Sequence, residues 1–357
     1  MSKDYNILVI NPGSTSTKLA LYRNEQVLFD EKIEHKSEEL IEYTNITDQY
    51  TFRLNIITNF LRQKGINQAH LDAVVGRGGL LKPISSGTYR INNQMLSDLR
   101  QAIYGEHASN LGALLAHGIA EKIDVPAYIV DPVVVDEMAP IARISGMKDI
   151  SRISIFHTLN QKAIARKAAI DLGIKYEIAN FIIAHLGGGI SVGIHSKGKV
   201  IDVNNALNGE GPFSPERSGG VPIGALVELC FSGKFTKTEI MKKIKGKGGL
   251  VGYLQTNDMR EIINRIENGN KRAKLILEAM AYQVAKEIGA GSTVLKGKID
   301  AIILTGGMAY SDEFISLIKD RVSFLSLVMI YAGEEEMLAL AEGALRVLNG
   351  MEVGKIY

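Results

Sequence analysis

The pattern of apolar runs separated by short polar turns predicts a three-stranded meander near the start of the chain. Residues 7–10 are a short apolar run, residues 18–22 form a second, mostly apolar strand after a polar turn, and residues 27–33 follow as a third strand. The first turn, residues 11–17, reads Asn-Pro-Gly-Ser-Thr-Ser-Thr and is rich in hydroxyl groups. A turn whose amides and hydroxyls point the same way forms a concave site for an anion.

A second meander occurs about 175 residues further along the chain. Its strands are predicted over residues 181–185, 190–194 and 200–203, and its first turn contains Gly187, Gly188 and Gly189. Two similar units indicate two related halves. Two anion-binding turns together would suit a chain of phosphates.

Helical spacing of apolar residues recurs between and after the meanders. The predicted helices cover residues 49–64, 110–123 (capped by Ser109 or Asn110), 158–172, 258–295 with a break near 268–270, and 335–349. Short buried strands are predicted over residues 73–75, 126–131 and 300–305. This order predicts an α/β duplication with an N-terminal domain over residues 1–150, joined by the C-terminal helix 335–357, and a C-terminal domain over residues 151–334.

Composition narrows the function classes. The net charge of +2 favours neither nucleic acid nor an anionic membrane as a partner. No apolar run reaches the roughly 18 residues of a membrane helix, and the N-terminus lacks the apolar region of a signal peptide. The single cysteine, Cys230, lies in the apolar run 225–231, which predicts a buried, reduced thiol in a cytoplasmic protein.

The turn after the first strand is the strongest chemical motif. It offers Asn11, Ser14, Ser16 and Lys18 within eight residues, more polar groups than a hairpin turn needs. Hydroxyls and amides can hold a phosphate, and the Lys18 ammonium can neutralise it. No G-x-x-x-x-G-K-[ST] sequence occurs, so the chain is not a P-loop protein.

The glycine turns of the second half also predict contacts with a nucleotide. After His185, the three glycines 187–189 lead into a strand, whereas a dinucleotide-binding turn would open a helix. Without Cβ atoms they allow the backbone to approach a phosphate. Gly306 and Gly307 follow a buried strand and could face a nucleoside, although a simple strand-to-helix turn would look the same.

Four cationic or titratable side chains stand in glycine-rich or irregular contexts, namely Arg77, His107, His157 and Arg217. Arg217 lies within residues 204–222, a long segment without periodicity, and such segments are often functional. Fixed arginine and histidine donors stabilise the charge of a phosphoryl group in transfer, and an arginine can also hold a carboxylate with two hydrogen bonds. The remaining histidines, His35, His70, His117 and His195, are expected in solvent.

Asp131 ends an apolar strand, and the three glutamates 334–336 open the last helix. An aspartate at a strand end beside phosphates often serves Mg²⁺, in many cases through water. Glutamates in a first helical turn are also a common capping pattern.

Together these motifs resemble the acetate kinase family over nearly the whole chain. Its N-x-G-S-S-S-x-K opening is matched by Asn11, Gly13, Ser14, Thr15, Ser16 and Lys18. The later matches follow in family order and are Arg77, His107, Asp131, His157, His185-Leu-Gly187, Arg217-Ser-Gly219 and Thr305-Gly-Gly307. The resemblance implies a duplicated actin-like, ribonuclease H-like α/β fold with two domains around a nucleotide cleft.

Departures from the acetate kinase motifs point to one branch of that family. This chain has Arg77-Gly-Gly-Leu-Leu81 where acetate kinases carry R-V-V-H-G-G. It has Phe156-His-Thr-Leu-Asn-Gln161 in place of F-H-G-T-S-H, and His185-Leu-Gly-Gly-Gly189 in place of H-L-G-N-G. The chain is similar to the members that act on butyrate and branched-chain fatty acids. Gly79 stands where acetate kinases have valine, which predicts room for a four-carbon acid, and Phe156 and Pro215 resemble positions that wall the acyl pocket.

The resemblance implies ATP + butyrate ⇌ ADP + butyryl phosphate, by direct in-line transfer with Mg²⁺. Arg77 and Arg217 would bind the carboxylate and the phosphoryl group, His157 would donate to the phosphoryl group, and His107 would support it. Asp131 and Glu336 would position Mg²⁺, with the choice among glutamates 334–336 open. The implied nucleotide-binding residues are Asn11, Ser14, Ser16, Lys18, His185, Gly187, Gly188, Gly189, Gly306 and Gly307. A cytoplasmic homo-oligomer with ATP/ADP, a short-chain carboxylate and its acyl phosphate as ligands is expected.

Three alternatives stay open at this point. The preferred acid could be isobutyrate, isovalerate, propionate or acetate. A chaperone or filament protein of the same fold would hydrolyse ATP without an acid, but such proteins carry longer domains. A sugar kinase would need a catalytic aspartate to accept a hydroxyl proton, and Asp131 could be mistaken for one.

Overall fold

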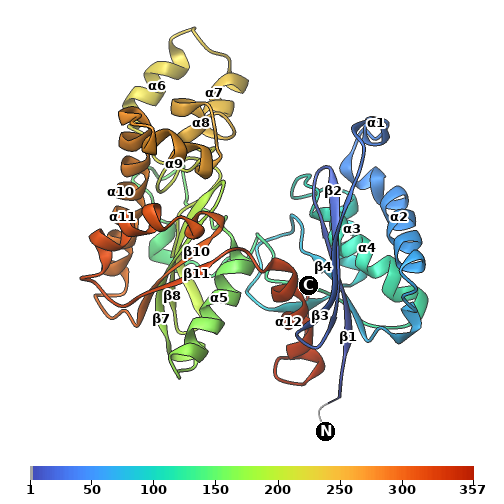
Figure 1. Ribbon diagram of the computed structural model, residues 1–357. Helices are drawn as coiled ribbons and strands as arrows, with labels where there is room; N and C mark the ends of the chain where they lie inside the picture. The colour runs from blue at the N-terminus through green and yellow to red at the C-terminus, as the bar shows by residue number, and fades with distance from the viewer. Residues whose placement is uncertain (1–2) are drawn as a thin grey trace. The chain divides into compact units, whose positions relative to one another are not determined.

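The structure, a computed structural model, describes residues 3–357 (Figure 1). The chain forms two compact units. Unit 1 comprises the chain up to Val135 together with Glu335–Tyr357, and unit 2 comprises Asp136–Glu334. The sequence prediction placed the change of domain at residue 150, whereas the division in the structure falls after Val135.

Unit 1 is built on a seven-stranded mixed sheet in the order β12-β5-β6-β4-β1-β2-β3. Its strands are β1 (Asn6–Pro12), β2 (Ser16–Arg23), β3 (Gln26–Glu34), β4 (Ala73–Arg77), β5 (Thr88–Arg90), β6 (Ala127–Val130) and β12 (Lys355–Ile356). Strands β1, β2 and β3 form the predicted antiparallel meander, and β4 and β6 continue the sheet in parallel with β1.

Helices cover both faces of this sheet. Alternate residues of each strand point to opposite faces, so both sets of side chains can pack against helices. Leu8 and Ile10 pack in one core cluster with Leu54 of α2 and Leu111 of α4. Figure 1 shows α2, α3 and α4 on one face of the sheet and α12 on the other. The helices of the unit are α1 (Ser37–Leu40), α2 (Tyr50–Gln63), α3 (Asn93–Arg100), α4 (Asn110–Ala120) and α12 (Glu336–Leu348), with short 3₁₀ turns η1 (Ile46–Gln49), η2 (Gln68–His70) and η3 (Glu121–Ile123).

Unit 2 repeats the plan with a five-stranded sheet in the order β11-β10-β7-β8-β9. The strands are β7 (Asn180–Leu186), β8 (Ile190–Ser196), β9 (Lys199–Val203), β10 (Ala301–Gly306) and β11 (Val328–Ala332). Phe181 and Ile183 pack in the cluster that includes α5, whereas Ile182 and Ala184 pack in the cluster that includes α10 and α11. Both faces of β7 are therefore buried, which explains its unbroken apolar sequence.

The helices of unit 2 are α5 (Thr158–Asp171), α6 (Ile223–Phe231), α7 (Lys237–Ile244), α8 (Gly249–Leu254), α9 (Met259–Glu267), α10 (Lys271–Val294) and α11 (Asp312–Val322), with 3₁₀ turns η4 (Pro140–Arg143), η5 (Tyr176–Ile178) and η6 (Gly307–Tyr310). Helices α6 to α9 gather beside one end of α10 (Figure 1). Among residues 3–357, the structure contains no helix with the length and apolarity of a membrane span.

Both meanders and all five predicted helical regions are confirmed, including the break between α9 and α10. The prediction that the Cys230 thiol is buried is wrong, because its side chain is exposed. Cys230 lies on α6, none of whose residues is buried in this single chain, and Phe231 beside it is 86% exposed. An apolar run indicates a helix but does not distinguish a core helix from one that presents its apolar side chains to solvent.

Candidate active site

A buried arginine shapes the hydroxyl-rich turn between β1 and β2. The Arg53 guanidinium of α2 donates from Nη1 to the carbonyls of Gly13 (2.8 Å) and Ser16 (2.9 Å), and from Nη2 to that of Ser14 (3.0 Å). Arg53 is fully buried, and burial lowers its pKa to about 10, which leaves it charged at neutral pH. The carbonyl oxygens of the turn are thus held by Arg53, while the side chains of Ser14 and Lys18 are exposed.

The prediction that His35 lies in solvent is wrong. The imidazole is 5% exposed, and its Nε2 lies 2.8 Å from the hydroxyl of Thr17, which in turn accepts from Arg53 at 3.1 Å. Burial, and then the charge of Arg53, lower the pKa of His35 to about 4, against the weaker opposing effect of Glu39 and Glu34. The local sequence does not reveal this burial, because the imidazole packs against Phe52 of α2, with the ring centroids 5.6 Å apart.

Unit 1 should therefore lose stability on mild acidification. The unfolded chain binds a proton at His35 below about pH 6.5, but the folded chain does so only below about pH 4, so the free energy of unfolding falls as pH decreases through this window. The loss should approach about 3 kcal/mol. Urea titrations at several pH values should give a flatter dependence for His35→Gln, while His70→Gln, at an exposed site, should match the parent. A His35→Gln slope equal to the parent's would contradict this assignment.

Three of the predicted polar residues meet at one end of the unit 1 sheet. Arg77, the last residue of β4, forms an ion pair with Glu336 in the first turn of α12. The amide of Asn11 on β1 donates to the same Glu336 oxygen, Oε2, at 3.0 Å. The side chains of Arg77 and Glu336 are 25% and 22% exposed, so a ligand can reach this charged pair.

Asp131 and His107 have local partners in unit 1. Asp131 is 1% exposed, and its Oδ1 accepts from the Ser86 hydroxyl at 2.6 Å and the Gly87 amide at 2.7 Å. The exposed His107 contacts the Ser109 hydroxyl through Nδ1 at 2.8 Å. Asp131 is thus enclosed by its own unit, and its assignment to Mg²⁺ stays a prediction.

The room expected beside Gly79 is not present. A Cβ at this position would lie 2.5 Å from Asn110 Oδ1 and 2.6 Å from Asn110 Cα, at the start of α4. Gly79 is therefore needed for the close approach of this helix, and the space that a valine would fill is taken by Asn110. The physical argument from Gly79 to a four-carbon pocket was wrong, because the sequence does not reveal which neighbour occupies the vacated space.

In unit 2, two predicted histidines stack on each other. The rings of His157, at the N-terminus of α5, and His185, on β7, lie 3.8 Å apart and within 13° of parallel. His157 Nδ1 is 2.8 Å from the Ser191 hydroxyl, and His185 Nδ1 is 2.8 Å from Asn160 Oδ1. On its other side, His185 Nε2 lies 3.0 Å from Glu334 Oε1. Each ring is thus held by a polar partner at its Nδ1.

The glycine turn and Arg217 are also brought together in unit 2. A Cβ on Gly189 would lie 1.7 Å from Arg217 Nη1 and 2.4 Å from its Cζ, so only glycine leaves space for the guanidinium there. Arg217 Nη1 donates to the carbonyl of Ala206 at 2.6 Å. Burial lowers the Arg217 pKa, partly offset by the charge of Glu216. The arginine is thus fixed between the Gly189 backbone and a carbonyl of the irregular segment.

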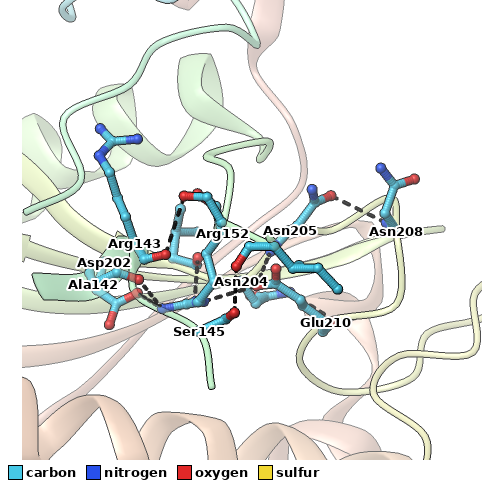
Figure 2. Close-up of polar contacts among 12 residues, drawn as sticks. Ala142, Arg143, Ser145, Arg152, Asp202, Asn204, Asn205, Asn208 and Glu210 are labelled. Atoms are coloured by element: carbon cyan, nitrogen blue, oxygen red, sulfur yellow. Dashed lines mark hydrogen bonds and ion pairs between the residues drawn. The ribbon is translucent and has the colours of Figure 1, made fainter. Parts of the chain in front are cut away.

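Arg152 holds this irregular segment in place (Figure 2). Its guanidinium donates to Asp202 on β9 at 2.8 Å and to the Val203 carbonyl at 3.0 Å, and it pairs with Glu210 at 3.3 Å. Glu210 also accepts from the amide of Asn205 at 3.1 Å. The loop between residues 205 and 210, which supplies the carbonyl for Arg217, is therefore fastened to the sheet. Sequence analysis did not single out Arg152.

A cavity of about 1010 Å³ opens within unit 2 and includes several predicted nucleotide contacts. Gly187, Gly188, Gly307 and Glu334 line it, as does Pro215, which was assigned to the acyl pocket. Phe156 instead packs with Met138, Val200 and Val203 in a small core cluster. The further lining residues that sequence analysis missed are Asn257, Asp258, Met259, Arg260, Ile263, Asn264, Glu267, Met308, Tyr310, Ser311, Asp312 and Glu313.

One carboxylate in each unit could contribute to a Mg²⁺ site. This ion is usually held by one or two carboxylates together with nucleotide phosphates and water. Within residues 3–357, no group of three or more His, Cys, Asp or Glu side chains could hold a metal by itself. Glu336 fits a share in such a site, because it is partly exposed and both its contacts use Oε2. Glu334, 41% exposed beside the unit 2 cavity, fits as well.

Comparison with known proteins identifies the family. Residues 146–344, more than half of the chain, match the model of the Acetokinase family. The chain is 58% identical over 353 residues to Butyrate kinase 1 of Clostridium acetobutylicum, covering 99% of both chains. Among solved structures, it resembles an acetate kinase of Porphyromonas gingivalis (TM-score 0.81, 20% identity, 96% of this chain and 100% of that one) and a propionate kinase of Francisella tularensis (TM-score 0.75, 21% identity, 95% and 98%). The expected α/β fold class is confirmed, and the chain belongs to the Acetokinase family.

Proposed function

We propose that this protein transfers the γ-phosphoryl group of ATP to butyrate and forms ADP and butyryl phosphate in a reversible reaction. The observation that carries the choice of acid is the 58% identity to Butyrate kinase 1 over nearly the whole of both chains. The stacked histidines, the Gly189–Arg217 contact and the cavity of unit 2 support a phosphoryl transfer.

The chemistry needs no general base, because a carboxylic acid is already ionised at pH 7. A carboxylate oxygen attacks the γ-phosphorus, the bond to the β,γ-bridging oxygen breaks, and its electron pair leaves with ADP. Catalysis then consists of positioning and of stabilising charge on the phosphoryl oxygens.

The residues of unit 2 have defined roles in this proposal. Gly187, Gly188 and Gly189 present their backbone to the nucleotide's phosphates, and His185 is held beside them. Gly306 and Gly307 face the adenosine. Arg217 and His157 donate hydrogen bonds to the phosphoryl group in transfer, since each is fixed by other groups of the unit.

The residues of unit 1 complete the proposal. The transferring phosphate is bound by Asn11, Ser14, Ser16 and Lys18. Arg77 binds the carboxylate through two hydrogen bonds from its guanidinium. His107 supports the phosphoryl group. Glu336 would help to hold Mg²⁺, which would supply positive charge to the nucleotide's phosphates when bound.

We also propose that the protein is a cytoplasmic homo-oligomer. Exposed apolar side chains on and beside α6, among them Val221, Ile223, Val227 and Phe231, support self-association, because monomers rarely expose such groups together. The exposed free thiol of Cys230 supports a reducing compartment.

A panel of acids tests the choice of substrate. With ATP, and with hydroxylamine to trap the acyl phosphate, kcat/KM should be highest for butyrate and about tenfold lower for acetate, since two further buried CH₂ groups contribute roughly 0.8 kcal/mol each. Propionate, isobutyrate and isovalerate complete the panel, and a reaction without acid is the control. A kcat/KM for acetate or a branched acid at or above that for butyrate would contradict the proposal, as would ATP hydrolysis independent of any acid.

A further inference from the structure

A chain of buried polar side chains ends at His157 in unit 2. It begins at Tyr176, whose hydroxyl lies 2.8 Å from Nδ1 of His195. His195 Nε2 is 3.0 Å from Oε1 of Gln161, and Gln161 Nε2 is 2.9 Å from the hydroxyl of Ser191. His195, Gln161 and Ser191 are all fully buried, so the expectation that His195 lies in solvent is wrong. Burial beneath α5 lowers the pKa of His195 well below its ordinary value and keeps the ring neutral.

The orientation of the Gln161 amide is fixed by the backbone. Its Nε2 also lies 3.1 Å from the carbonyl oxygen of Ser191, and a carbonyl can only accept a hydrogen bond. The amide nitrogen must therefore face Ser191, and Oε1 must face His195. Because Oε1 only accepts, the neutral ring of His195 carries its proton on Nε2 and accepts at Nδ1 from the Tyr176 hydroxyl.

The Ser191 hydroxyl then has one direction in which to donate. Its oxygen accepts from Gln161 Nε2 at 2.9 Å and, more weakly, from the backbone amide of His157 at 3.5 Å. Its third partner among residues 3–357 is Nδ1 of His157, at 2.8 Å. Since the first two partners are donors, the hydroxyl proton points to His157 Nδ1. A histidine nitrogen that accepts leaves the proton on the other nitrogen.

We propose that Gln161 and Ser191 are positioning residues that hold His157 as the tautomer with its proton on Nε2. This tautomer makes Nε2 a hydrogen-bond donor, which is what a phosphoryl oxygen requires. The stack on His185, itself tied to Asn160, keeps the plane of the ring. The inference rests on the role proposed above for His157, but the tautomer is a property of the protein without substrate.

The test combines nitrogen NMR with kinetics. In ¹⁵N-labelled protein at neutral pH, His157 should show a protonated Nε2 and an unprotonated Nδ1. Ser191→Ala should leave a mixture of tautomers, and Gln161→Glu should shift the population toward Nδ1–H, because a carboxylate accepts the Ser191 proton. Partners that orient metal-binding histidines are worth about 10- to 100-fold in activity, and a similar fall in kcat is expected here, with the KM for ATP little changed.

Ser326→Ala is the matched control, because it also removes a hydrogen-bonded serine hydroxyl from unit 2, in this case one that donates to the carbonyl of Ile299 at 2.8 Å. It should keep both the tautomer of His157 and kcat. A parent protein with His157 protonated at Nδ1, or variants at Ser191 and Gln161 that retain the parent's tautomer and kcat, would overturn the inference. Failure of the proposed function would look different, since the parent would then lack activity with butyrate whatever its tautomer.

Discussion

Replacement of Arg217 by alanine is expected to lower turnover with ATP and butyrate by about 10³-fold or more. Arginines that stabilise a transferring phosphoryl group contribute factors of this size. Arg217 is suited to the role, because the Gly189 backbone and the Ala206 carbonyl hold its guanidinium in one place before substrate arrives. The measurement is kcat for acyl phosphate formation with both substrates saturating.

Arg217→Lys separates charge from geometry. Lysine keeps the positive charge but loses the planar fork, so it should recover only a small part of the lost turnover. Circular dichroism and thermal melting would establish that both variants are folded. A folded Arg217→Ala protein with near-normal turnover would remove Arg217 from the mechanism.

A methyl group on Gly189 is expected to reduce turnover by about 10²-fold or more. The added carbon would lie 1.7 Å from Nη1 of Arg217, so the guanidinium must leave its position. A displacement of about 1 Å from productive geometry can cost 10²-fold in rate. The loss should appear in kcat rather than in the KM for ATP.

Gly188→Ala provides the comparison. Its Cβ would have Glu216 as its nearest neighbour, at 3.8 Å, so the methyl fits without moving Arg217. In the proposed mechanism this variant reports only the cost of a methyl group in the phosphate-binding turn, so it should be much less impaired than Gly189→Ala. Equal losses in the two variants would mean that the Arg217 contact is not the reason for glycine at position 189.

Local sequence patterns predicted most of the fold, because the signals were strong and short-range. Apolar runs separated by polar or glycine-rich turns located both meanders, and helical spacing located α2, α5 and the pair α9 and α10. The motif residues also fall into groups within each unit, with Arg77, Asn11 and Glu336 in contact in unit 1, and His157 stacked on His185 in unit 2.

The residues that were missed act through partners distant in sequence. Arg53 stands about forty residues from the turn that it holds, and nothing in its helical context marks it as buried. Asp258 and Arg260, at the start of α9, line the unit 2 cavity although they are distant in sequence from its glycine turns. Gly79 shows the same limit, because its neighbour Asn110 comes from α4, which begins 31 residues later.

The return of the chain's last segment to unit 1 affects the order of events on the ribosome. Strand β12 pairs with β5, and the Tyr5 hydroxyl donates to the carbonyl of Leu348, so the N-terminal unit needs residues from α12 onward to be complete. Unit 2 is one continuous segment and is fully synthesised before those residues emerge. Synthesis proceeds at about 5–20 residues per second, so unit 1 waits on the order of 10 to 40 seconds for α12. Unit 2, although encoded second, is therefore able to finish folding first.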